Sequence, residues 1–448
     1  MIMPTIAQLA GREILDSRGR PTVEARCTLD SGAIGVAAVP SGASTGSAKA
    51  LELRDGDARR YRGLGCRRAA SHVGGAIQAA LARQPFADQA ALDAALLALD
   101  GTPNKGRLGA NALLAVSLAF ARAVAAERGV PLYAHFATIL DEGRKTKDER
   151  SSSSFVFRPS SPSSLPRLTI NLFSGGKHAG GQAPIQDVLL VPTARTIDEG
   201  LATVFAVYQA AAELVHAKYG MRALTADEGG LAPLFPDAET MLADAVAAIR
   251  AAGMAPGQDV ALALDVAASH FYRDGRYALG DQSLDSAAMI AQLGEWVERY
   301  PIVSVEDGLA EDDWAYWPAL HTRLAGRALT LGDDLLCTNP GRIGRAIKSR
   351  AADALLLKVN QIGTLSESAE ACRLARAAGW RVTISARSGE TEDNWLADLA
   401  VGWGGDQIKV GSITQSERLA KYNRLLAIEA ETVWPVVDWP TMWKEDQS

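Results

Sequence analysis

Residues 301–307 read PIVSVED, a short run with two valines and an isoleucine that ends in two carboxylates. Six further short apolar runs lie in the same part of the chain: IQDVLLVP (185–192), ALALDV (261–266), LTLGDD (329–334), ALLLKVN (354–360), RVTISAR (381–387) and DQIKVGS (406–412). Ala-rich segments with helical character, such as residues 238–253, separate most of these runs. Strands that alternate with helices favour parallel pairing, so we expect an α/β fold with a (β/α)₈-type barrel.

A charged residue stands near the C-terminal end of six of these runs. The six residues are Asp265, Glu306, Asp333, Lys358, Arg387 and Lys409. In a (β/α)₈ barrel the C-terminal ends of the strands converge on one face, where active sites are built. A charge at the end of one strand is common. Six in succession, of the types that bind metals and anions, predict an active site on this face.

Three of the six charged residues are carboxylates. Asp265, Glu306 and Asp333 offer three oxygen donors with room for water, a set that suits Mg²⁺. We therefore expect these residues to bind Mg²⁺. The alternative is three surface carboxylates with Lys or Arg partners, which is the commoner situation for acidic residues taken singly.

The basic residues complete a chemical hypothesis. Lys358 follows four apolar residues, and desolvation favours the neutral form of a lysine. Near Mg²⁺ and the second cation Lys409 its pKa should fall further, so that it can remove a proton α to a carboxylate. Arg387 and Ser388 offer a fork and a hydroxyl to a phosphate. The alternatives are a lysine that reaches solvent from a strand end and a turn that caps the next segment.

Two earlier segments carry further candidates. The stretch TADEGGLAP (225–233) places Glu228 before paired glycines, where the backbone is free to approach a ligand. Residues 41–46 form a small, hydroxyl-rich loop that can close over a substrate, or alternatively serve only as a polar lead-in to a helix. Of the six histidines we single out His178, which precedes a strand, and interpret the others as structural.

Composition limits the class of protein. The chain has 448 residues with a net charge of −6, 48% hydrophobic and 22% charged residues, which is typical of a globular protein. Basic residues are scattered, so we expect no nucleic-acid or anionic-membrane partner. The four cysteines form no CxxC pair, which predicts a cytoplasmic setting, and no signal peptide or 18-residue apolar run is evident.

The first third of the chain has a different organisation. Residues 23–29 and 32–40 are expected strands joined by a turn, and residues 111–129 form a strong helix that stops at Gly129. Residues 141–166 are charged and then rich in Ser and Pro. Because they cannot bury a core, we interpret them as a flexible connector or surface insertion.

Together these stretches resemble motifs of the enolase family. The matching stretches include LDSRGRPTVEA (15–25), VPSGASTG (39–46), TADEGGLAP (225–233), YPIVSVED (300–307), LLKVNQIGTL (356–365), RSGETED (387–393) and SERLAKYN (416–423). They span the chain apart from the predicted insertion. The resemblance implies a small N-terminal α+β domain over residues 1–140, the insertion over 141–166, and a modified (β/α)₈ barrel of the enolase kind over 167–448.

The resemblance also implies an activity. Enolases are Mg²⁺-dependent carbon–oxygen lyases (phosphopyruvate hydratases) that interconvert 2-phosphoglycerate and phosphoenolpyruvate in glycolysis. By position, Asp265, Glu306 and Asp333 would bind the first Mg²⁺, and Ser44 a second. Lys358 would abstract the proton from C2 of the substrate.

The remaining roles follow in the same way. Glu228 would protonate the departing C3 hydroxyl, with His178, Gln186 and Asp187 beside it. A second set would hold the substrate: Lys409 its carboxylate, and Arg387 and Ser388 its phosphate. The resemblance further implies a homodimer, in which Glu24 and Arg418 would pair across a two-fold axis.

The chain departs from the family pattern around the leaving-group half of this site. The family reads SHRSGETED where this chain has Ala386, and it has Glu where this chain has Asp187. Lys177 and Lys49 each replace a family Glu with a cation. Two alternatives therefore stay open beside an ordinary enolase. One is a paralogue that does enolate chemistry on a related phosphonate or carboxylate, and the other is a non-catalytic binding protein.

Overall fold

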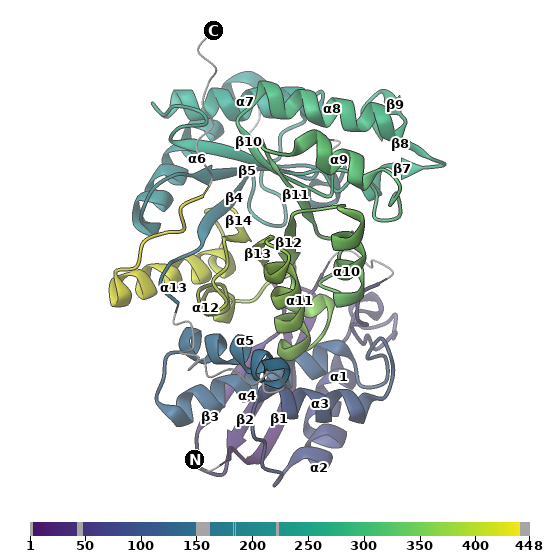
Figure 1. Ribbon diagram of the computed structural model, residues 1–448, viewed down its shortest axis with the longest axis vertical. Coiled ribbons are helices and arrows are strands. Elements are labelled where there is room, and N and C mark those ends of the chain that lie inside the picture. The colour runs from purple at the N-terminus through teal and green to yellow at the C-terminus, as the bar shows by residue number, and fades with distance from the viewer. Residues whose placement is uncertain are drawn as a thin grey trace.

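The computed structural model describes residues 3–42, 48–148, 162–181, 183, 185–220 and 224–439. Two domains follow one another along the long axis of the molecule, the N-terminal one at the bottom of Figure 1 and a barrel above it. The N-terminal domain contains an antiparallel sheet and five α-helices: β1 (Ile6–Leu15), β2 (Pro21–Leu29), β3 (Ile34–Ala38), α1 (Arg67–His72), α2 (Gln78–Leu81), α3 (Gln89–Asp100), α4 (Ala110–Arg128) and α5 (Leu132–Asp148).

Helix α4 confirms the helix predicted over residues 111–129, and it forms the core of this domain. It packs on β2 and β3, and most of its residues are buried. It ends at Gly129, which adopts the left-handed conformation (φ +63°) that glycine accepts without strain. Among the described residues α4 is the one helix long and apolar enough to cross a membrane, and 83% of its apolar window is buried inside the protein.

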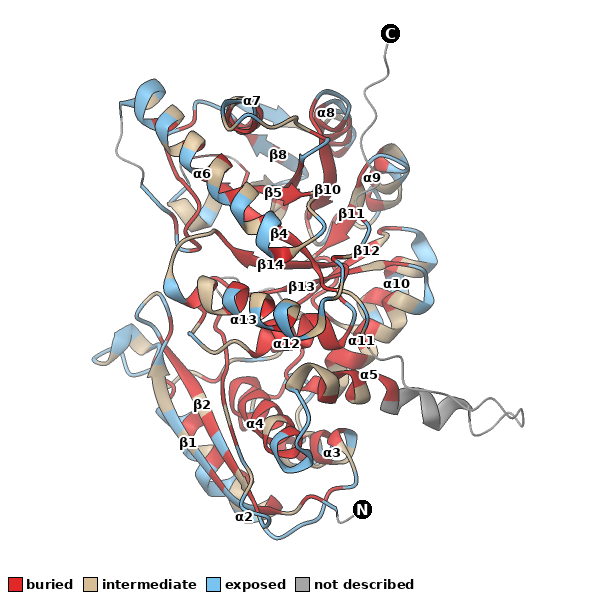
Figure 2. Ribbon diagram, turned by 90° about the vertical axis from the view of Figure 1, so that its left-hand side faces the viewer, coloured by how far each residue is buried: buried red, intermediate tan, exposed pale blue. Residues whose placement is uncertain are grey.

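The second domain is a closed barrel of eight strands. Its strands are β4 (Arg167–Ser174), β5 (Asp187–Pro192), β6 (Val260–Asp265), β10 (Ile302–Glu306), β11 (Leu329–Gly332), β12 (Ala354–Leu357), β13 (Arg381–Ser385) and β14 (Gln407–Gly411). Helices surround it: α6 (Ile197–Tyr219), α7 (Ala238–Ala251), α8 (Ser286–Arg299), α9 (Trp317–Leu324), α10 (Pro340–Ser349), α11 (Leu365–Ala377), α12 (Trp395–Gly402) and α13 (Ser416–Thr432). All residues of these strands except Leu329 and Arg381 are buried (Figure 2), and the closed order of the strands confirms the predicted barrel.

The barrel departs from the parallel pairing that the sequence pattern favoured. Strand β5 runs antiparallel to both of its neighbours, β4 and β6. Residues 175–186 connect β4 to β5 without an α-helix, so the chain turns back at the end where it left, and such a connection gives antiparallel strands. Two helices, α6 and α7, then return it to the start of β6. The first residue of β5, Asp187, therefore lies at the same end as the last residues of the other strands.

Two further expectations need correction. Strand β4 was absent from the seven apolar runs, although it is fully buried. The start of the insertion predicted over 141–166 is helical and not irregular, because α5 continues to Asp148. Near its other end, the backbone N–H of Leu165 donates to Pro435 at 2.9 Å, and Leu165 is buried. The rest of the predicted insertion, residues 149–161, lies outside the described residues.

A three-stranded hairpin sheet extends from the barrel after β6. It consists of β7 (Tyr272–Arg273), β8 (Arg276–Leu279) and β9 (Gln282–Leu284), and it lies far from the N-terminal domain in Figure 1. The N-terminal domain instead docks against the C-terminal face of the barrel. Lys105 Nζ lies 2.7 Å from Glu367 Oε1, and the backbone N–H of Ala50 donates to Gln361 at 2.8 Å.

Arg418, the predicted partner of Glu24 in a second subunit, makes its contacts within its own chain in this structure. Arg418 is fully buried, and its guanidinium donates to the carbonyl oxygens of Arg387, Ser388 and Val410 at 2.7–2.9 Å. Glu24 instead pairs with Arg12 of the same chain at 2.5 Å. The arginine thus organises the loop after β13 within its own chain.

Candidate active site

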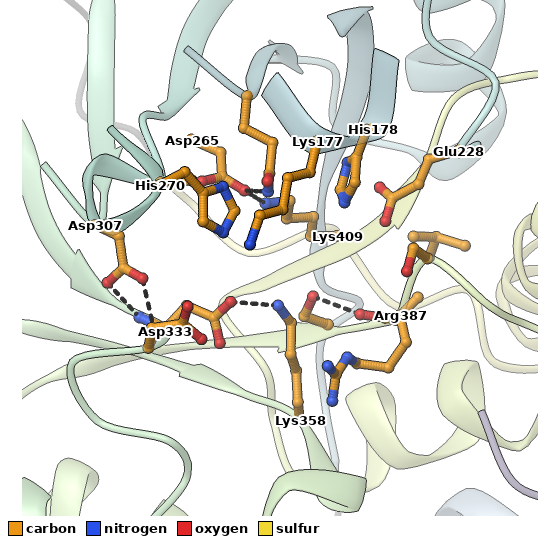
Figure 3. Close-up of a pocket in the computed structure, with 17 residues that line it drawn as sticks. Lys177, His178, Glu228, Asp265, His270, Asp307, Asp333, Lys358, Arg387 and Lys409 are labelled. Atoms are coloured by element: carbon orange, nitrogen blue, oxygen red, sulfur yellow. Dashed lines mark hydrogen bonds and ion pairs between the residues drawn. The ribbon is translucent and has the colours of Figure 1, made fainter. Parts of the chain in front are cut away.

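The C-terminal ends of the barrel strands enclose a polar pocket. It is lined by Lys177, His178, Gln186, Glu228, Asp265, Ala267, His270, Asp307, Asp333, Asp334, Lys358, Ser385, Ala386, Arg387, Ser388, Lys409 and Val410. Figure 3 shows Lys358 and Glu228 pointing into this pocket from different sides. Most of the predicted site residues therefore meet at one place, as the strand-end pattern required.

Lys409, on β14, joins two of the predicted metal ligands. Its ammonium lies 2.7 Å from Asp265 Oδ2 and 2.7 Å from Glu306 Oε2. Asp265 and Glu306 are register partners on β6 and β10, so their side chains emerge side by side. Burial and the neighbouring Asp265 carboxylate raise the pKa of Glu306 well above its usual range. One ammonium thus offsets only part of the negative charge gathered here.

Lys358 pairs with the third predicted ligand. Its Nζ lies 2.5 Å from Asp333 Oδ2, and the other oxygen of Asp333 accepts from Gln361 at 2.6 Å. Burial favours neutral lysine, but the Asp333 carboxylate outweighs it and raises the pKa of Lys358. The expectation of a neutral Lys358 therefore does not hold in this structure, because its partner carboxylate stabilises the ammonium.

The described residues include two groups of at least three metal-ligating side chains whose ligand atoms all lie within 4.8 Å: His178 with Asp187 and Glu228, and Asp307 with Asp333 and Asp334. The predicted set of Asp265, Glu306 and Asp333 is not one of them. The two lysines account for this difference, since each holds its carboxylates in ion pairs.

The predicted carboxylates nevertheless fit a divalent cation. Asp265 and Glu306 are each 2% exposed, and Glu306 Oε1 is buried without a hydrogen-bond partner among the described residues. These three carboxylates share two ammonium groups, those of Lys358 and Lys409, and carboxylate oxygens are the ligands that Mg²⁺ prefers. A cation would also give the unpaired, buried Oε1 of Glu306 a partner. Ser44, the predicted ligand of a second ion, lies outside the described residues.

The predicted acid side forms a separate cluster. Asp187 is fully buried, accepts from Ser174 Oγ at 2.5 Å, and lies 3.5 Å from His178 Nδ1. Glu228 accepts from Asn171 at 3.1 Å. Burial opposes a charged imidazole, but the Glu228 and Asp187 carboxylates prevail and raise the pKa of His178 to about 9. Burial itself raises the pKa of Asp187. Burial opposes ionisation of Glu228 too, but the charges of His178 and Arg418 lower its pKa, so the cluster favours a charged imidazole beside the Glu228 carboxylate.

Gln186 links this cluster to the carboxylates. Its side-chain amide donates to Asp265 Oδ2 at 2.8 Å, and its backbone N–H donates to the Asp265 carbonyl at 3.0 Å. It lines the pocket, as predicted. The antiparallel β5 is the reason, since it brings residues 186 and 187 to this end of the barrel.

Both predicted phosphate-binding residues line the pocket, and Figure 3 shows Arg387 at its lower edge. Arg387 is 6% exposed, and its Nη1 donates to Asn360 Oδ1 at 2.7 Å. Ser388 Oγ accepts from Arg18 Nη1 at 2.8 Å. Gly42 lies against the Arg387 guanidinium, so that a Cβ at this glycine would be 1.8 Å from Nη2. The N-terminal domain thus fixes both residues from outside the barrel.

Sequence reasoning missed several residues of the site. Arg18 and Asn360, which orient Ser388 and Arg387, stand far from them in the chain, so no local signal reveals them. Asp307 accepts from the backbone N–H groups of Asp333 and Asp334 at 3.0 and 2.7 Å. The expectation that His270 is merely structural also needs correction, because His270 lines the pocket.

Two family models match the chain. The model of the enolase C-terminal TIM barrel domain covers residues 162–435, and that of the enolase N-terminal domain covers residues 6–136. The chain belongs to the enolase family. The matches stop and resume around the predicted insertion, and together they assign this enolase-family protein to the enolase-superfamily lyases. Acidic clusters at the pocket suit the Mg²⁺ that enolase-family proteins generally use.

Proposed function

We propose that this protein is a Mg²⁺-dependent carbon–oxygen lyase that interconverts 2-phosphoglycerate and phosphoenolpyruvate, as a glycolytic enzyme does. The observation that carries the proposal is the placement of Lys358 and Glu228 at different sides of one pocket, with cations available for both acidic groups of the substrate. Lys409 would hold the carboxylate, and Arg387 with Ser388 the phosphate.

The reaction assigns a proton to each of two residues. Lys358 takes the C2 proton, and the electron pair of the C2–H bond passes into the substrate carboxylate, where Lys409 supplies positive charge. The double bond between C2 and C3 then forms as the C3–O bond breaks. Glu228 gives a proton to the departing hydroxyl, which leaves as water. His178 and Asp187 exchange protons with Glu228.

A divalent cation would be held by Asp265, Glu306 and Asp333, and a second by Ser44. It would supply positive charge to the substrate carboxylate and so lower the pKa of the C2 proton. Because a cation on Asp333 competes for the carboxylate that now holds the Lys358 ammonium, it would also lower the pKa of Lys358. Binding of the cation would thus favour the neutral form of Lys358, which can accept the C2 proton.

Proton exchange at C2 tests the proposal directly. Purified protein with Mg²⁺ and 2-phosphoglycerate in D₂O should exchange the C2 proton, measured by proton NMR, and form phosphoenolpyruvate. Lys358→Ala should lose both reactions, whereas Glu228→Gln should lose dehydration and keep exchange. If the wild-type protein neither exchanges nor dehydrates, a binding role replaces the lyase.

A second candidate function is enolate chemistry on a related phosphonate or carboxylate. Ala386 and Asp187 favour it, because both shorten the side chains of the leaving-group half while Lys358 and the carboxylates are kept. Exchange with a phosphonate analogue but not with 2-phosphoglycerate would support this candidate over the first.

We also propose a cytoplasmic homodimer. The four cysteines Cys27, Cys66, Cys337 and Cys372 are free and buried, which suits a reducing compartment. Arg12 pairs with Glu24 but keeps a side chain that is 71% exposed, so a partner surface can contact it as well. Light scattering at micromolar concentration should give about twice the mass of one 47.3 kDa chain, and a mass near that of one chain would refute the dimer.

A further inference from the structure

Lys177 brings a cation into the pocket that the chemistry above does not use. It lies in the loop 175–186 next to His178, and Figure 3 shows its ammonium pointing into the pocket between His178 and His270. No hydrogen bond or ion pair joins Lys177 to another of the residues that the structure describes. The other pocket ammonium groups, those of Lys358 and Lys409, are both paired with carboxylates.

A second cavity begins where Lys177 and His270 stand. It measures about 680 Å³ and is lined by Gly176, Lys177, Gly180, Gly181, Ala183, Phe235, Pro236, His270, Phe271, Ala278 and Gly280. Lys177 and His270 line both this cavity and the pocket, so they form the wall between the two. A ligand too long for the pocket would extend past Lys177 and His270 into the second cavity.

The pocket and the second cavity differ in the charges of their lining residues. The pocket contains several carboxylates, but no carboxylate is among the described residues that line the second cavity, where Lys177 is the only formal charge. His270 Nδ1 is buried without a hydrogen-bond partner among the described residues. An anion next to this wall would therefore meet the Lys177 ammonium beside the His270 ring, with no acidic side chain among the described residues of the second cavity to repel it.

The walls of the second cavity leave room for such an anion. Gly180 and Gly181 have φ values of +71° and +84°, and a Cβ at either would meet nothing within 4 Å. Phe235, Pro236 and Phe271 supply an apolar side. The second cavity thus combines open space and an apolar side with one ammonium at the wall.

We propose that Lys177 and His270 form a subsite for an additional acidic group on the C3 side of the substrate, and that the second cavity receives what lies beyond it. This proposal rests on the proposed function, because the C3 side is defined by the position of Glu228 and His178. It names the substrate class as a 2-phosphorylated 3-hydroxy carboxylic acid that carries a third acidic group bonded to C3, so that the C3 hydroxyl still leaves as water.

A matched pair of unreactive ligands tests the subsite. In 2-phospholactate C3 is a methyl group, whereas 2-phosphomalate of the same configuration adds a carboxylate to C3, and neither has a C3 hydroxyl to lose. Calorimetric titration in Mg²⁺ should show that wild-type protein binds 2-phosphomalate on the order of tenfold more tightly, as a charge-assisted contact provides. Lys177→Gln should remove this preference, and Lys177→Glu should reverse it.

Lys348→Gln is the matched control. Lys348 is exposed near the end of α10, away from the pocket lining, so this variant loses the same charge and should keep the preference. Equal affinity of wild-type protein for the two ligands, or a preference that survives Lys177→Gln, overturns the subsite. C2 exchange with 2-phosphoglycerate is measured on the same preparation. If exchange is seen without a preference, only the subsite is lost, and if neither ligand binds and exchange is absent, the proposed function is lost with it.

Discussion

Ala386 contributes only a methyl side chain to the lining of the pocket. It is 6% exposed, and its backbone N–H donates to the Lys409 carbonyl at 2.8 Å, so the β13–β14 pairing fixes its place beside Arg387. An imidazole here would supply a donor that this chain lacks. Loss of one such donor typically costs on the order of 10²–10³ in rate.

The first prediction follows from this position. Ala386→His combined with Asp187→Glu should raise dehydration of 2-phosphoglycerate more than C2 exchange, because both residues lie on the leaving-group side. The measurement is the ratio of phosphoenolpyruvate formed to C2 proton exchanged, with Ala386→Ser as the size-matched control for a polar side chain. Wild-type dehydration at ordinary enzyme rates, about 10 s⁻¹, would instead leave no deficit to repair.

His135 provides a prediction on stability and pH. It is 3% exposed in α5, and neither ring nitrogen has a hydrogen-bond partner among the described residues. Burial lowers the pKa of His135 to about 4, so the unfolded chain binds this proton first as the pH falls. The stability contributed by the neutral imidazole is complete above about pH 6.5 and is lost as the pH falls towards 4, by up to about 3 kcal/mol.

Urea unfolding at several pH values tests this. His135→Leu should lose less stability than wild type between pH 7 and pH 5, because the variant has no imidazole to protonate. His216→Gln, at an exposed position of α6, controls for loss of an imidazole without loss of burial. Parallel pH profiles for wild type and His135→Leu would show that the buried ring does not govern acid sensitivity.

At the level of elements, Gly42 of the N-terminal domain lies against Arg387, a pocket residue of the barrel. Because a Cβ at this position would overlap the Arg387 guanidinium, Gly42→Ala should push the guanidinium away from the pocket. We expect KM for a phosphorylated substrate to rise about tenfold or more, with little change in the unfolding temperature, since the guanidinium is the flexible end of a side chain. Gly344→Ala is the control, since nothing lies within 4 Å of its Cβ position. An unchanged KM would mean that Arg387 does not bind the phosphate.

The elements also show what a sequence can and cannot predict. Seven apolar runs predicted seven barrel strands, and the charged ends of six runs predicted five residues of the pocket lining, because the C-terminal ends of parallel barrel strands lie on one face. The predicted direction of β5 is wrong, because an apolar run does not reveal how the chain enters and leaves it. The helix-free loop before β5 and the two helices after it make β5 antiparallel to its neighbours. The pairing of Lys358 with Asp333 depends on distances between strands, and so do the roles of Arg18 and His270.

For the whole molecule, the cation site links metal binding to folding. A ligand that binds only the folded state stabilises it, by about 2.7 kcal/mol at 100 times its Kd. Mg²⁺ should therefore raise the unfolding temperature of wild-type protein, and Asp265→Asn should abolish most of this rise. Asp281→Asn removes the same charge at an exposed turn between β8 and β9 and should respond as wild type does. An identical response of Asp265→Asn and wild type would place the ion elsewhere.

The antiparallel β5 has a consequence for how this protein can change. Ser174 and Asp187 are register partners, and the backbone N–H of Gly175 donates to Gln186 at 2.7 Å, so the loop 175–186 begins and ends at one point of the barrel rim. A loop closed in this way is a cassette that can be exchanged without altering the strands on which it stands. The cassette carries Lys177 and His178 together, so grafting it between family members would transplant a substrate preference in one step.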